Sequence, residues 1–384
     1  MGLSVFALGG AGAVGAECCR DLLTNADLER LTIGEIDLVK AHELAASLDD
    51  PRVEVVRTDV TDVAATARAV AGHQVLMNLL FWESFDGALE AACLADANYA
   101  DLLSHPEERH RVMAREAGIT AVSGLGASPG AGNVLGQKAC TMLEVPLQLE
   151  ISCTSYRPVA PSKGLLDTLI ALLSPDLPSR GYHFLGQFVP TRPLEGSKLV
   201  DFGGPVGEVP VYYINHSETF TFPKHFPTLQ YVAVRGTYRP ALQEDFRILA
   251  KYGLLDDLEQ ETPHGRVNVR RLVRDTIWNK WGEVDDDDSH HLFLHVQSQG
   301  LVGDTLKTIT CRASHPLDWG SAAIGKMTGI GASIGVMGLA RQGRTKIGMV
   351  DPEEYFDADQ FIADLRERPG VTVEITEESS VSDS

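Results

Sequence analysis

The glycine-rich run after the first apolar segment constrains this chain more than any other feature of its sequence. Leu3–Leu8 is hydrophobic, and Gly10, Gly12 and Gly15 follow it with the spacing Gly-x-Gly-x-x-Gly, at the start of the helical pattern Ala13–Leu23. In a strand–turn–helix unit the first glycine permits the tight turn, the second lets a pyrophosphate approach the backbone, and the third lets the helix pack closely. The position between a strand and a helix favours a dinucleotide site over a plain glycine-rich turn.

Short apolar runs and helical patterns alternate through the first 125 residues. The expected strands are Leu3–Leu8, Leu31–Gly34, Val53–Arg57, Gln74–Leu80, Tyr99–Leu102 and Ile119–Ser123. Strands that alternate with helices at this spacing predict an α/β fold whose N-terminal domain, residues 1–125, is a Rossmann domain with a doubly wound parallel sheet.

The pattern changes after Gly124, and the length of 384 residues suits two domains. Residues 126–376 are expected to form a second, α+β domain for substrate binding and dimerisation, with residues 377–384 as a disordered tail. Its expected elements are an antiparallel strand Gln148–Tyr156, a helix Leu165–Leu173, a strand-rich region Val209–Val234, paired strands Leu292–Gln299 and Thr305–Ala313, and a helix Ser321–Arg341 that packs on the first domain.

Acidic residues near the ends of the first strands suggest which dinucleotide is bound. Glu35 lies about 20 residues beyond Gly15, where a carboxylate accepts a hydrogen bond from the ribose 2′-hydroxyl and repels a 2′-phosphate. No arginine stands beside Glu35 in the sequence, so NAD is expected rather than NADP. The residues expected to bind it are Gly10, Ala11, Gly12, Ala13, Val14, Gly15, Glu35, Asp59 and Asn78. Asp59 fits an adenine contact or a helix cap equally well, and Asp37 is interpreted as a cap.

Composition restricts the partners of the protein. With 33 basic and 53 acidic residues the formal charge is -20, which argues against binding to nucleic acid or to an anionic membrane. The six cysteines lack metal-ligand spacing, and Asp285–Asp288 is interpreted as a solvated loop, so no metal site is expected. No leader and no membrane-length apolar run is recognised, which predicts a cytoplasmic protein with reduced thiols.

Several further segments carry a resemblance to a known family. They are "NYADLL" at Asn98–Leu103, "GASPGAGNVLGQKA" at Gly126–Ala139, "VRGTYRP" at Val234–Pro240, the helix Gly325–Gly343 and the closing segment Asp351–Leu365. In this order the chain resembles the saccharopine dehydrogenase-like family, nearest its lysine 6-dehydrogenase and saccharopine reductase branch. Two departures concern the substrate. Ser128 stands where the reductases have aspartate, and proline follows Arg239.

The resemblance implies hydride transfer between a nicotinamide and a carbon that bears nitrogen. The leading hypothesis is NAD-dependent oxidative deamination of the primary amine of an amino acid, of the lysine 6-dehydrogenase type. Alternatives are a saccharopine- or opine-type reductase that joins an amino acid to a carbonyl compound, an enzyme acting on a larger secondary-metabolite intermediate, and a non-catalytic NAD-sensing regulator. The family also implies a homodimer.

Such chemistry needs a cation for the substrate carboxylate and a group that accepts the amine proton. Arg239 is the first candidate for the carboxylate, with Arg235 second and Tyr238 beside them. The candidates for proton transfer are Tyr99 and Asp101, near the expected nicotinamide, and His216 and His225, which flank the expected strand in "SETFTFPKHF". Glu218 has no assigned role, and His290 and His291 are expected to be exposed.

Overall fold

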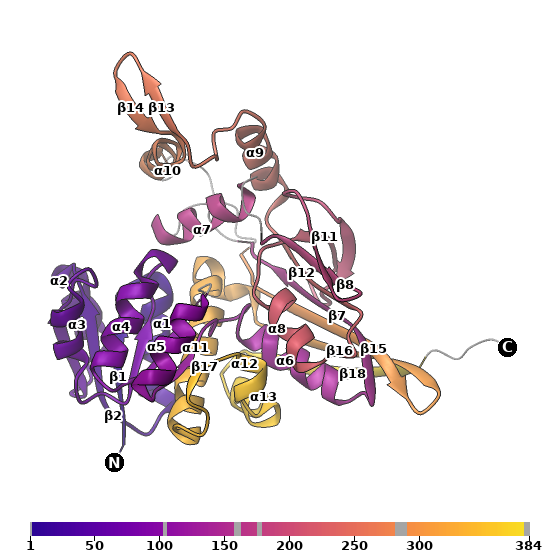
Figure 1. The fold of residues 1–384 in the computed structure, drawn as a ribbon, viewed down its shortest axis with the longest axis horizontal. Coiled ribbons are helices and arrows are strands. Elements are labelled where there is room, and N and C mark those ends of the chain that lie inside the picture. The colour runs from indigo at the N-terminus through magenta and orange to yellow at the C-terminus, as the bar shows by residue number, and fades with distance from the viewer. Residues whose placement is uncertain (1, 103–105, 157–162, 175–178, 281–289, 380–384) are drawn as a thin grey trace. The chain divides into compact units, whose positions relative to one another are not determined.

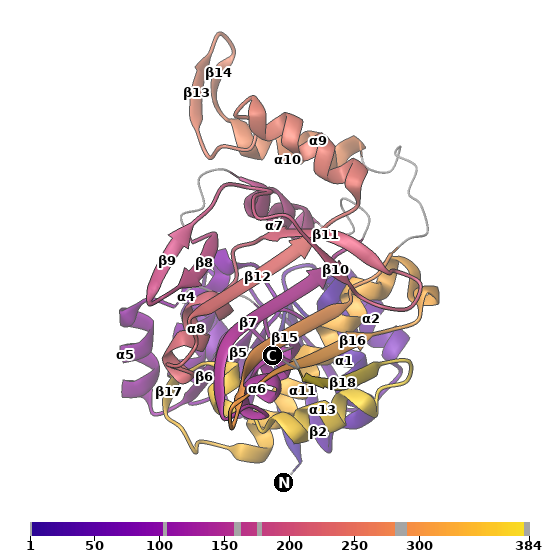
Figure 2. The same ribbon diagram turned by 90° about the vertical axis from the view of Figure 1, so that its right-hand side faces the viewer.

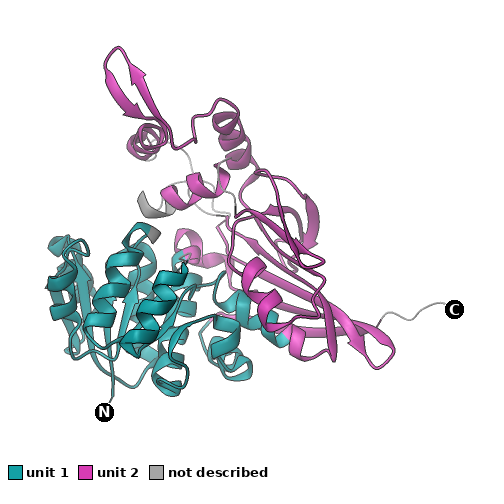
Figure 3. Cartoon of the chain, viewed as in Figure 1, with its two compact units in different colours: residues 1–138, 325–369 teal, residues 139–324, 370–384 magenta. Residues whose placement is uncertain are grey.

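The computed structural model describes residues 2–102, 106–156, 163–174, 179–280 and 290–379. The chain divides into two compact units. Unit 1 comprises Met1–Lys138 and Gly325–Pro369, and unit 2 comprises Ala139–Ile324 and Gly370–Ser384 (Figure 3).

Unit 1 is built on a seven-stranded sheet in which every pairing is parallel, in the order β17-β6-β5-β4-β1-β2-β3 (Figure 1). Its strands are β1 (Leu3–Leu8), β2 (Leu28–Glu35), β3 (Val53–Arg57), β4 (Val75–Asn78), β5 (Asn98–Asp101), β6 (Thr120–Val122) and β17 (Gly348–Val350). This order is that of a Rossmann sheet, extended at one edge by β17, so the predicted fold class is confirmed. The last strand lies more than 200 residues after β6 in the sequence and was not expected in this sheet.

Helices connect most of these strands because parallel strands need crossover connections, and further helices follow β17. They are α1 (Ala13–Asn25), α2 (Leu38–Leu48), α3 (Val63–Val70), η1 (Trp82–Ser84), α4 (Phe85–Leu94), α5 (Glu108–Ala117), α6 (Ala131–Thr141), α11 (Ala323–Gln342), α12 (Pro352–Tyr355) and α13 (Ala358–Arg366). Every residue of β1 is buried, as expected for a strand covered on both faces. The core on one side joins Phe6, Leu76 and Tyr99 to Leu89 of α4.

Helix α11, which corresponds to the helix expected over Ser321–Arg341, lies very close to α1. A methyl group added at Gly329 would sit 2.7 Å from the amide nitrogen of Cys18, so only glycine allows this approach. The segment Leu317–Gln342 has the length and mean hydropathy, 1.3, of a membrane span, contrary to expectation. However, 78% of that window is buried, as in the core helix of a globular protein.

Unit 2 contains a nine-stranded mixed sheet with the order β10-β11-β12-β7-β15-β16-β18, to which β8 and β9 are added beside β12. Its strands are β7 (Val145–Thr154), β8 (Gly181–Phe184), β9 (Gln187–Pro190), β10 (Lys198–Asp201), β11 (Glu208–Tyr213), β12 (Tyr231–Thr237), β15 (Leu294–Val302), β16 (Thr305–Ser314) and β18 (Thr372–Ser379). Figure 2 looks onto this sheet, with β7 between β12 and β15. The predicted antiparallel pairing of β15 with β16 is confirmed, whereas β7 is antiparallel to β15 but parallel to β12.

The other elements of unit 2 are α7 (Lys163–Leu173), α8 (Glu218–His225), α9 (Pro240–Lys251), the hairpin β13 (Glu259–Thr262) and β14 (Gly265–Asn268), α10 (Val269–Lys280) and η3 (Leu317–Ala322). Helices α7, α9 and α10 share one apolar cluster, to which Leu169, Phe246 and Ile277 contribute.

Three expectations for unit 2 were wrong. The segment "SETFTFPKHF" forms helix α8 rather than a strand, because its buried residues Glu218, Thr221 and Phe222 follow helical spacing and not alternation. His290 and His291 are buried instead of exposed, since His291 pairs with Tyr156 through backbone hydrogen bonds. Residues 377–379, expected in a disordered tail, belong to β18 and pair with β16. The acidic run 285–288 lies outside the described residues.

A buried ion pair ties the end of unit 1 to its first helix, and it provides a test of the fold. Arg368 Nε lies 3.0 Å from Asp21 Oδ1, with both side chains under 10% exposed. Arg368→Ala would leave a buried carboxylate without its cation, so we expect a loss of about 3–5 kcal/mol in the free energy of unfolding. Urea denaturation measures this loss.

The matched control is Arg20→Ala, which removes an exposed pair with Glu17 on α1. This substitution should cost about 0.5 kcal/mol or less. Equal losses for the two variants would show that the Asp21–Arg368 pair does not stabilise the unit.

Candidate cofactor and substrate sites

The turn between β1 and α1 has the geometry of a pyrophosphate cradle. Gly12 occupies the N-cap position of α1, and no side chain caps the helix there. The amides of the first turn, beginning with Ala13 and Val14, therefore lack intrahelical acceptors and are available to an anion. A methyl group at Gly12 would meet only the carbonyl oxygen of Gly9, at 3.3 Å, so the space above this residue is open.

Two other glycines shape the turn itself. Gly9, and not Gly10 as expected, has the left-handed backbone conformation, with φ of 78°. A Cβ atom at Gly15 would lie 2.6 Å from the carbonyl oxygen of Gly9, which forces the first turn of α1 against the preceding loop. The predicted motif is thus confirmed as a tight strand–turn–helix connection.

A small hollow of about 90 Å³ lies at the carboxyl ends of β1, β2 and β3, beside this turn. Its lining includes Gly9, Glu35, Thr58, Asp59 and Leu80. One carboxylate oxygen of Glu35 accepts a hydrogen bond from the amide of Ile36 at 3.0 Å, which fixes the side chain at the rim. The residues present therefore fit the adenosine end of a dinucleotide.

The register of the sheet adds a neighbour that the sequence did not reveal. No arginine stands beside Glu35 in the sequence, but Glu35 pairs directly with Arg57 on β3. Residues paired directly across neighbouring strands present their side chains on the same face. A carboxylate at this position favours the ribose hydroxyl of NAD, and a guanidinium favours the ribose phosphate of NADP. The pairing of Glu35 with Arg57 thus places one group of each kind at this end of the strands.

Asp37 and Asp59, the other two acidic candidates, differ in whether they cap a helix. Asp37 caps α2 by accepting from the amides of Val39 and Lys40, as interpreted from the sequence. Asp59 is not the cap of α3, because Asp62 takes that position.

The Asp59 carboxylate accepts instead from the amide and the hydroxyl of Thr61, at 3.0 and 2.6 Å. These bonds lower the pKa of the Asp59 carboxyl. Asp59 is thus held as an anion at the lining of the hollow.

Asn78 and Tyr99 form a buried pair behind the carboxyl end of β4. Asn78 Nδ2 donates to the Tyr99 hydroxyl at 3.1 Å, and Asn78 Oδ1 accepts from the amide of Leu80. Tyr99 has no exposed surface, and burial followed by the charge of Asp101 raises the pKa of its phenol well above the usual value. Asp101 accepts from Ser123 Oγ at 2.9 Å. The hydrogen bonds of Asn78, Tyr99 and Asp101 therefore stabilise the carboxyl ends of β4 and β5 inside unit 1.

The arginines expected to bind a carboxylate differ in their surroundings. Arg235 donates to the carboxylate of Glu150 and to the hydroxyls of Tyr213 and Tyr231, at 2.8 and 2.7 Å. These partners occupy its guanidinium, so Arg235 is removed from the substrate-binding candidates. Arg239, at the N-cap position of α9, is half-buried and stays a candidate.

Tyr238, expected beside these arginines, is 6% exposed in the apolar cluster of α7 and α9. Its carbonyl oxygen accepts a hydrogen bond from Gln243 Nε2, at 2.5 Å. Tyr238 is therefore a packing residue of this cluster.

A buried imidazole–carboxylate pair is the strongest candidate for proton transfer in unit 2. His216 Nδ1 lies 3.7 Å from Glu218 Oε1, and the two side chains are 7% and 0% exposed. Burial, followed by the Glu218 charge, raises the pKa of the neighbouring Cys153 thiol to about 12. His225 is at the other end of α8. Sequence reasoning left Glu218 unassigned, although its position two residues after His216 was the available signal.

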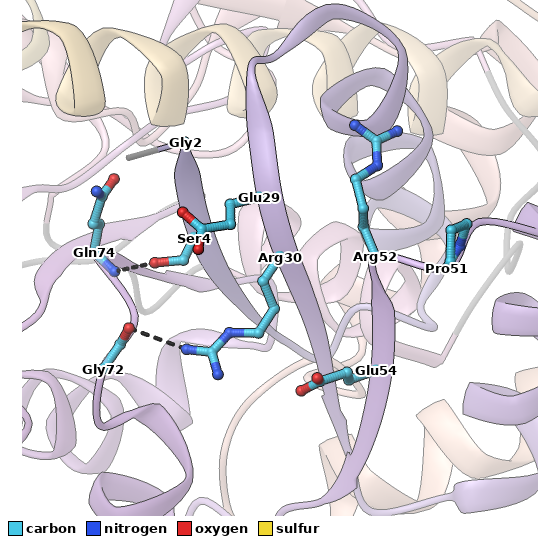
Figure 4. A pocket seen from close by; sticks show the side chains of 9 residues that line it. All are labelled: Gly2, Ser4, Glu29, Arg30, Pro51, Arg52, Glu54, Gly72 and Gln74. Atoms are coloured by element: carbon cyan, nitrogen blue, oxygen red, sulfur yellow. Dashed lines mark hydrogen bonds between the residues drawn. The ribbon is translucent and has the colours of Figure 1, made fainter.

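A separate hollow of about 440 Å³ lies at the amino ends of β1, β2 and β3 (Figure 4). Arg30 donates to the carbonyl of Gly72 there, and the amide of Gln74 donates to Ser4 Oγ. This hollow is at the opposite end of the strands from the glycine turn, so it is no part of the dinucleotide cradle.

Comparisons with known proteins agree with this geometry. Residues 5–122 match the family described as the saccharopine dehydrogenase NADP binding domain. A carboxyaminopropylagmatine dehydrogenase from Synechocystis sp. is 23% identical over 382 residues, which cover 93% of this chain and 94% of the relative.

Two solved structures share the fold. Saccharopine dehydrogenase (L-Glu forming) from Saccharomyces cerevisiae has a TM-score of 0.72 at 15% identity, over 98% of this chain and 100% of that chain. The homospermidine synthase of Legionella pneumophila, solved in complex with NAD, has a TM-score of 0.59 at 13% identity, over 98% and 91%.

The sheet, the glycine turn and the acidic end of β2 define a nicotinamide dinucleotide-binding domain. Residues 5–122 thus match a saccharopine dehydrogenase NADP binding domain, and over most of its length the chain is similar to a dehydrogenase of that kind, as its resemblance implied.

Two glycine substitutions separate the cradle from the fold. In Gly12→Ala the new methyl group would need only a small shift of the Gly9 carbonyl, 3.3 Å away, but would fill the space that the pyrophosphate requires. We expect dinucleotide affinity to fall about tenfold or more, equivalent to about 1.4 kcal/mol or more. Thermal unfolding of the free protein should change little. Isothermal titration calorimetry and a thermal melt measure the two effects.

The comparison variant is Gly15→Ala, whose methyl group collides with the Gly9 backbone. This variant should lower the melting temperature as well as the affinity. A Gly12→Ala protein with undiminished affinity would show that the pyrophosphate does not approach this backbone.

Proposed function

We propose that the protein is an NAD-dependent oxidoreductase that acts on the C–N bond of an amino-acid-derived secondary amine. The observation that carries this proposal is the glycine cradle with Glu35 at the rim of the adjacent hollow, in a domain of this family. Two relatives support the substrate class, because saccharopine dehydrogenase and carboxyaminopropylagmatine dehydrogenase are named for N-substituted amines.

Oxidation of the primary amine of an amino acid, as in the lysine 6-dehydrogenase type, is the second candidate. It is favoured by Ser128, which resembles the small residue of lysine dehydrogenases rather than the aspartate of the reductases. The first candidate acts on a secondary amine and the second on a primary amine, and both use NAD.

The choice of NAD over NADP depends on Glu35 and Arg57. The Glu35 carboxylate suits a ribose diol and repels a 2′-phosphate, whereas Arg57 would attract that phosphate. Glu35 lines the hollow and is held by the amide of Ile36, while Arg57 is exposed. The fixed carboxylate therefore favours NAD, although the matching family is described as NADP-binding.

The chemistry of the proposed reaction assigns roles to three side chains. When bound in the glycine cradle, NAD would supply the hydride acceptor for the carbon next to nitrogen. The amine must be neutral for this transfer, and we assign the removal of its proton to the His216 imidazole. Glu218, 3.7 Å away, would orient that ring and stabilise its charged form. Arg239 would hold a substrate carboxylate by paired hydrogen bonds.

Homodimer formation, a cytoplasmic location and a small amino-acid substrate stay predictions. A non-catalytic NAD sensor is the rival of another class, and turnover with any amine distinguishes the two.

Cofactor preference tests the assignment of Glu35. The wild-type protein should bind NAD more tightly than NADP. Glu35→Ser removes a charge-assisted hydrogen bond of about 1.5–3 kcal/mol, so NAD affinity should fall roughly 10- to 100-fold while NADP affinity rises. Quenching of tryptophan fluorescence by each dinucleotide measures both constants.

The matched variant is Arg57→Gln, which should leave the NAD constant unchanged and abolish the gain of NADP binding in the Glu35→Ser background. Tighter binding of NADP by the wild-type protein would assign the selection to Arg57 instead.

Turnover tests the reaction. With NAD, saccharopine or a related N-substituted amino acid should give absorbance of NADH at a higher kcat/KM than lysine does. The reverse ranking would select the lysine 6-dehydrogenase type, and no turnover with any amine would favour the sensor.

His216→Asn should lower kcat by about 100-fold or more, since general-base catalysis contributes roughly 10²–10⁴-fold. Glu218→Gln keeps the shape of the positioning residue and should have a smaller effect. An unchanged pH profile of kcat in His216→Asn would exclude His216 as the proton acceptor.

A further inference from the structure

One face of the sheet in unit 2 carries a continuous row of polar side chains across five strands. The register pairs Arg235 of β12 with Ser152 of β7, Ser152 with His295 of β15, His295 with Arg312 of β16, and Arg312 with Glu374 of β18. Residues paired directly across strands point to the same face. The sheet thus places two arginines on one face with a serine and a histidine between them.

The two arginines in this row have different surroundings. Arg235 is saturated by Glu150, Tyr213 and Tyr231. Arg312 Nε is shielded from solvent, yet no described residue accepts a hydrogen bond from it. Glu374, directly opposite on β18, is not within ion-pair distance of Arg312 among the described pairs. A shielded guanidinium donor without an acceptor is costly, so a hydrogen-bond acceptor is expected at this position.

Space for an anion exists on both sides of Arg312. One hollow of about 240 Å³ is lined by Arg312, His295, Lys198 and Ser152 together with Glu150 and Asp201. A second hollow, of about 190 Å³, is lined by Arg312 with Phe202, Gly204 and Glu374. Arg312 is therefore at the boundary of two cavities, each large enough for a compact polyatomic ion.

The larger hollow is lined by two cations, Arg312 and Lys198, and by two carboxylates. Its two carboxylates are engaged, because Glu150 pairs with Arg235 and with Lys198 at 3.0 Å, and Asp201 accepts from the amide of Gly203 at 2.8 Å. Burial, and then the charges of Arg312 and Lys198, lower the pKa of His295 to about 4, against a smaller opposing effect of Asp201. Arg312 and Lys198 thus act as positive charges on His295, in a protein with a formal charge of -20.

We propose that Arg312, with Lys198 and His295, binds a small oxyanion, a carboxylate or phosphate group, in the hollow on the polar face of the unit 2 sheet. The guanidinium would hold two oxygens of the ion by parallel hydrogen bonds. All of these residues belong to unit 2, and none of them lines the glycine cradle.

The site makes anion binding dependent on pH. A bound anion favours the protonated form of His295 and so raises the pKa of that imidazole from about 4. By linkage, affinity should increase as the pH falls through the pKa of the anion-bound state, and should level off below about 4. Sulfate, whose charge is constant over this range, isolates the contribution of the histidine.

Calorimetric titration of the full-length protein with inorganic phosphate and with malonate at pH 7 tests the proposal. We expect saturable binding of at least one of them in wild type, and Arg312→Gln should weaken it about tenfold or more. Tighter binding of malonate would identify a carboxylate ligand, and tighter binding of phosphate a phosphate ligand. Arg312→Lys keeps the positive charge but loses the paired N–H donors of the guanidinium. Its affinity for the ion should lie between those of wild type and Arg312→Gln.

The matched control is Arg247→Gln, which removes an exposed arginine paired with Glu244 on α9 and should leave binding unchanged. A second readout needs no variant at Arg312. In histidine NMR spectra of the wild type, with the His295 signal assigned through His295→Gln, sulfate should raise the pKa of His295 by one unit or more.

The proposal is overturned if neither ion saturates, or if Arg312→Gln binds as wild type does. It is also overturned if sulfate leaves the pKa of His295 unchanged in the NMR titration. If Arg312→Gln instead halves the mass of the particle in light scattering without any anion effect, a second copy supplies the acceptor and the ion site does not exist.

Discussion

The contact between the first turn of α1 and the end of β1 is the constraint on which the cofactor site depends. Gly15 is packed so closely on Gly9 that any side chain would collide with its carbonyl oxygen. This contact directs the first-turn amides of the helix to the carboxyl edge of the sheet, where β2 places Glu35. Because β1 is fully buried between its neighbours, the cradle is fixed by the core of the domain. Binding therefore requires little reorganisation of the backbone.

Features local in the sequence were predictable, and features created by pairing were not. The glycine motif, its flanking strand and helix, and the distance to Glu35 all lie within one β–α–β unit, whose geometry is the same wherever it occurs. Arg57 is 22 residues from Glu35, and only the parallel register of β2 and β3 brings the two together. In the same way β17 joins the first sheet from the far end of the chain, which no local pattern announces.

The errors in unit 2 have one physical origin. Alternating Thr and Phe in "SETFTFPKHF" satisfied the pattern of a half-buried strand, yet the chain buries one side of a helix there, because tertiary packing overrides weak local preference. The same helix brings Glu218 beside His216, so the error in secondary structure also concealed the pair of residues most suited to proton transfer. For His290 and His291, polarity suggested exposure, but both are buried, and His291 forms an isolated bridge with Tyr156.

The neighbours on the polar face of the second sheet are also set by strand pairing between segments that are far apart in the sequence. A strand such as β16 alternates its side chains, so Cys311 and Ala313 are buried on one face while Arg312 is on the other. Three separate strand pairings set the neighbours on that face. They place His295 beside Ser152, Arg312 beside His295, and Glu374 beside Arg312. Arg235 shows that this sheet satisfies a shielded guanidinium fully when its partners come from within the unit. Arg312 lies in the same row, but no described residue accepts a hydrogen bond from its Nε, and the proposed anion would supply that acceptor.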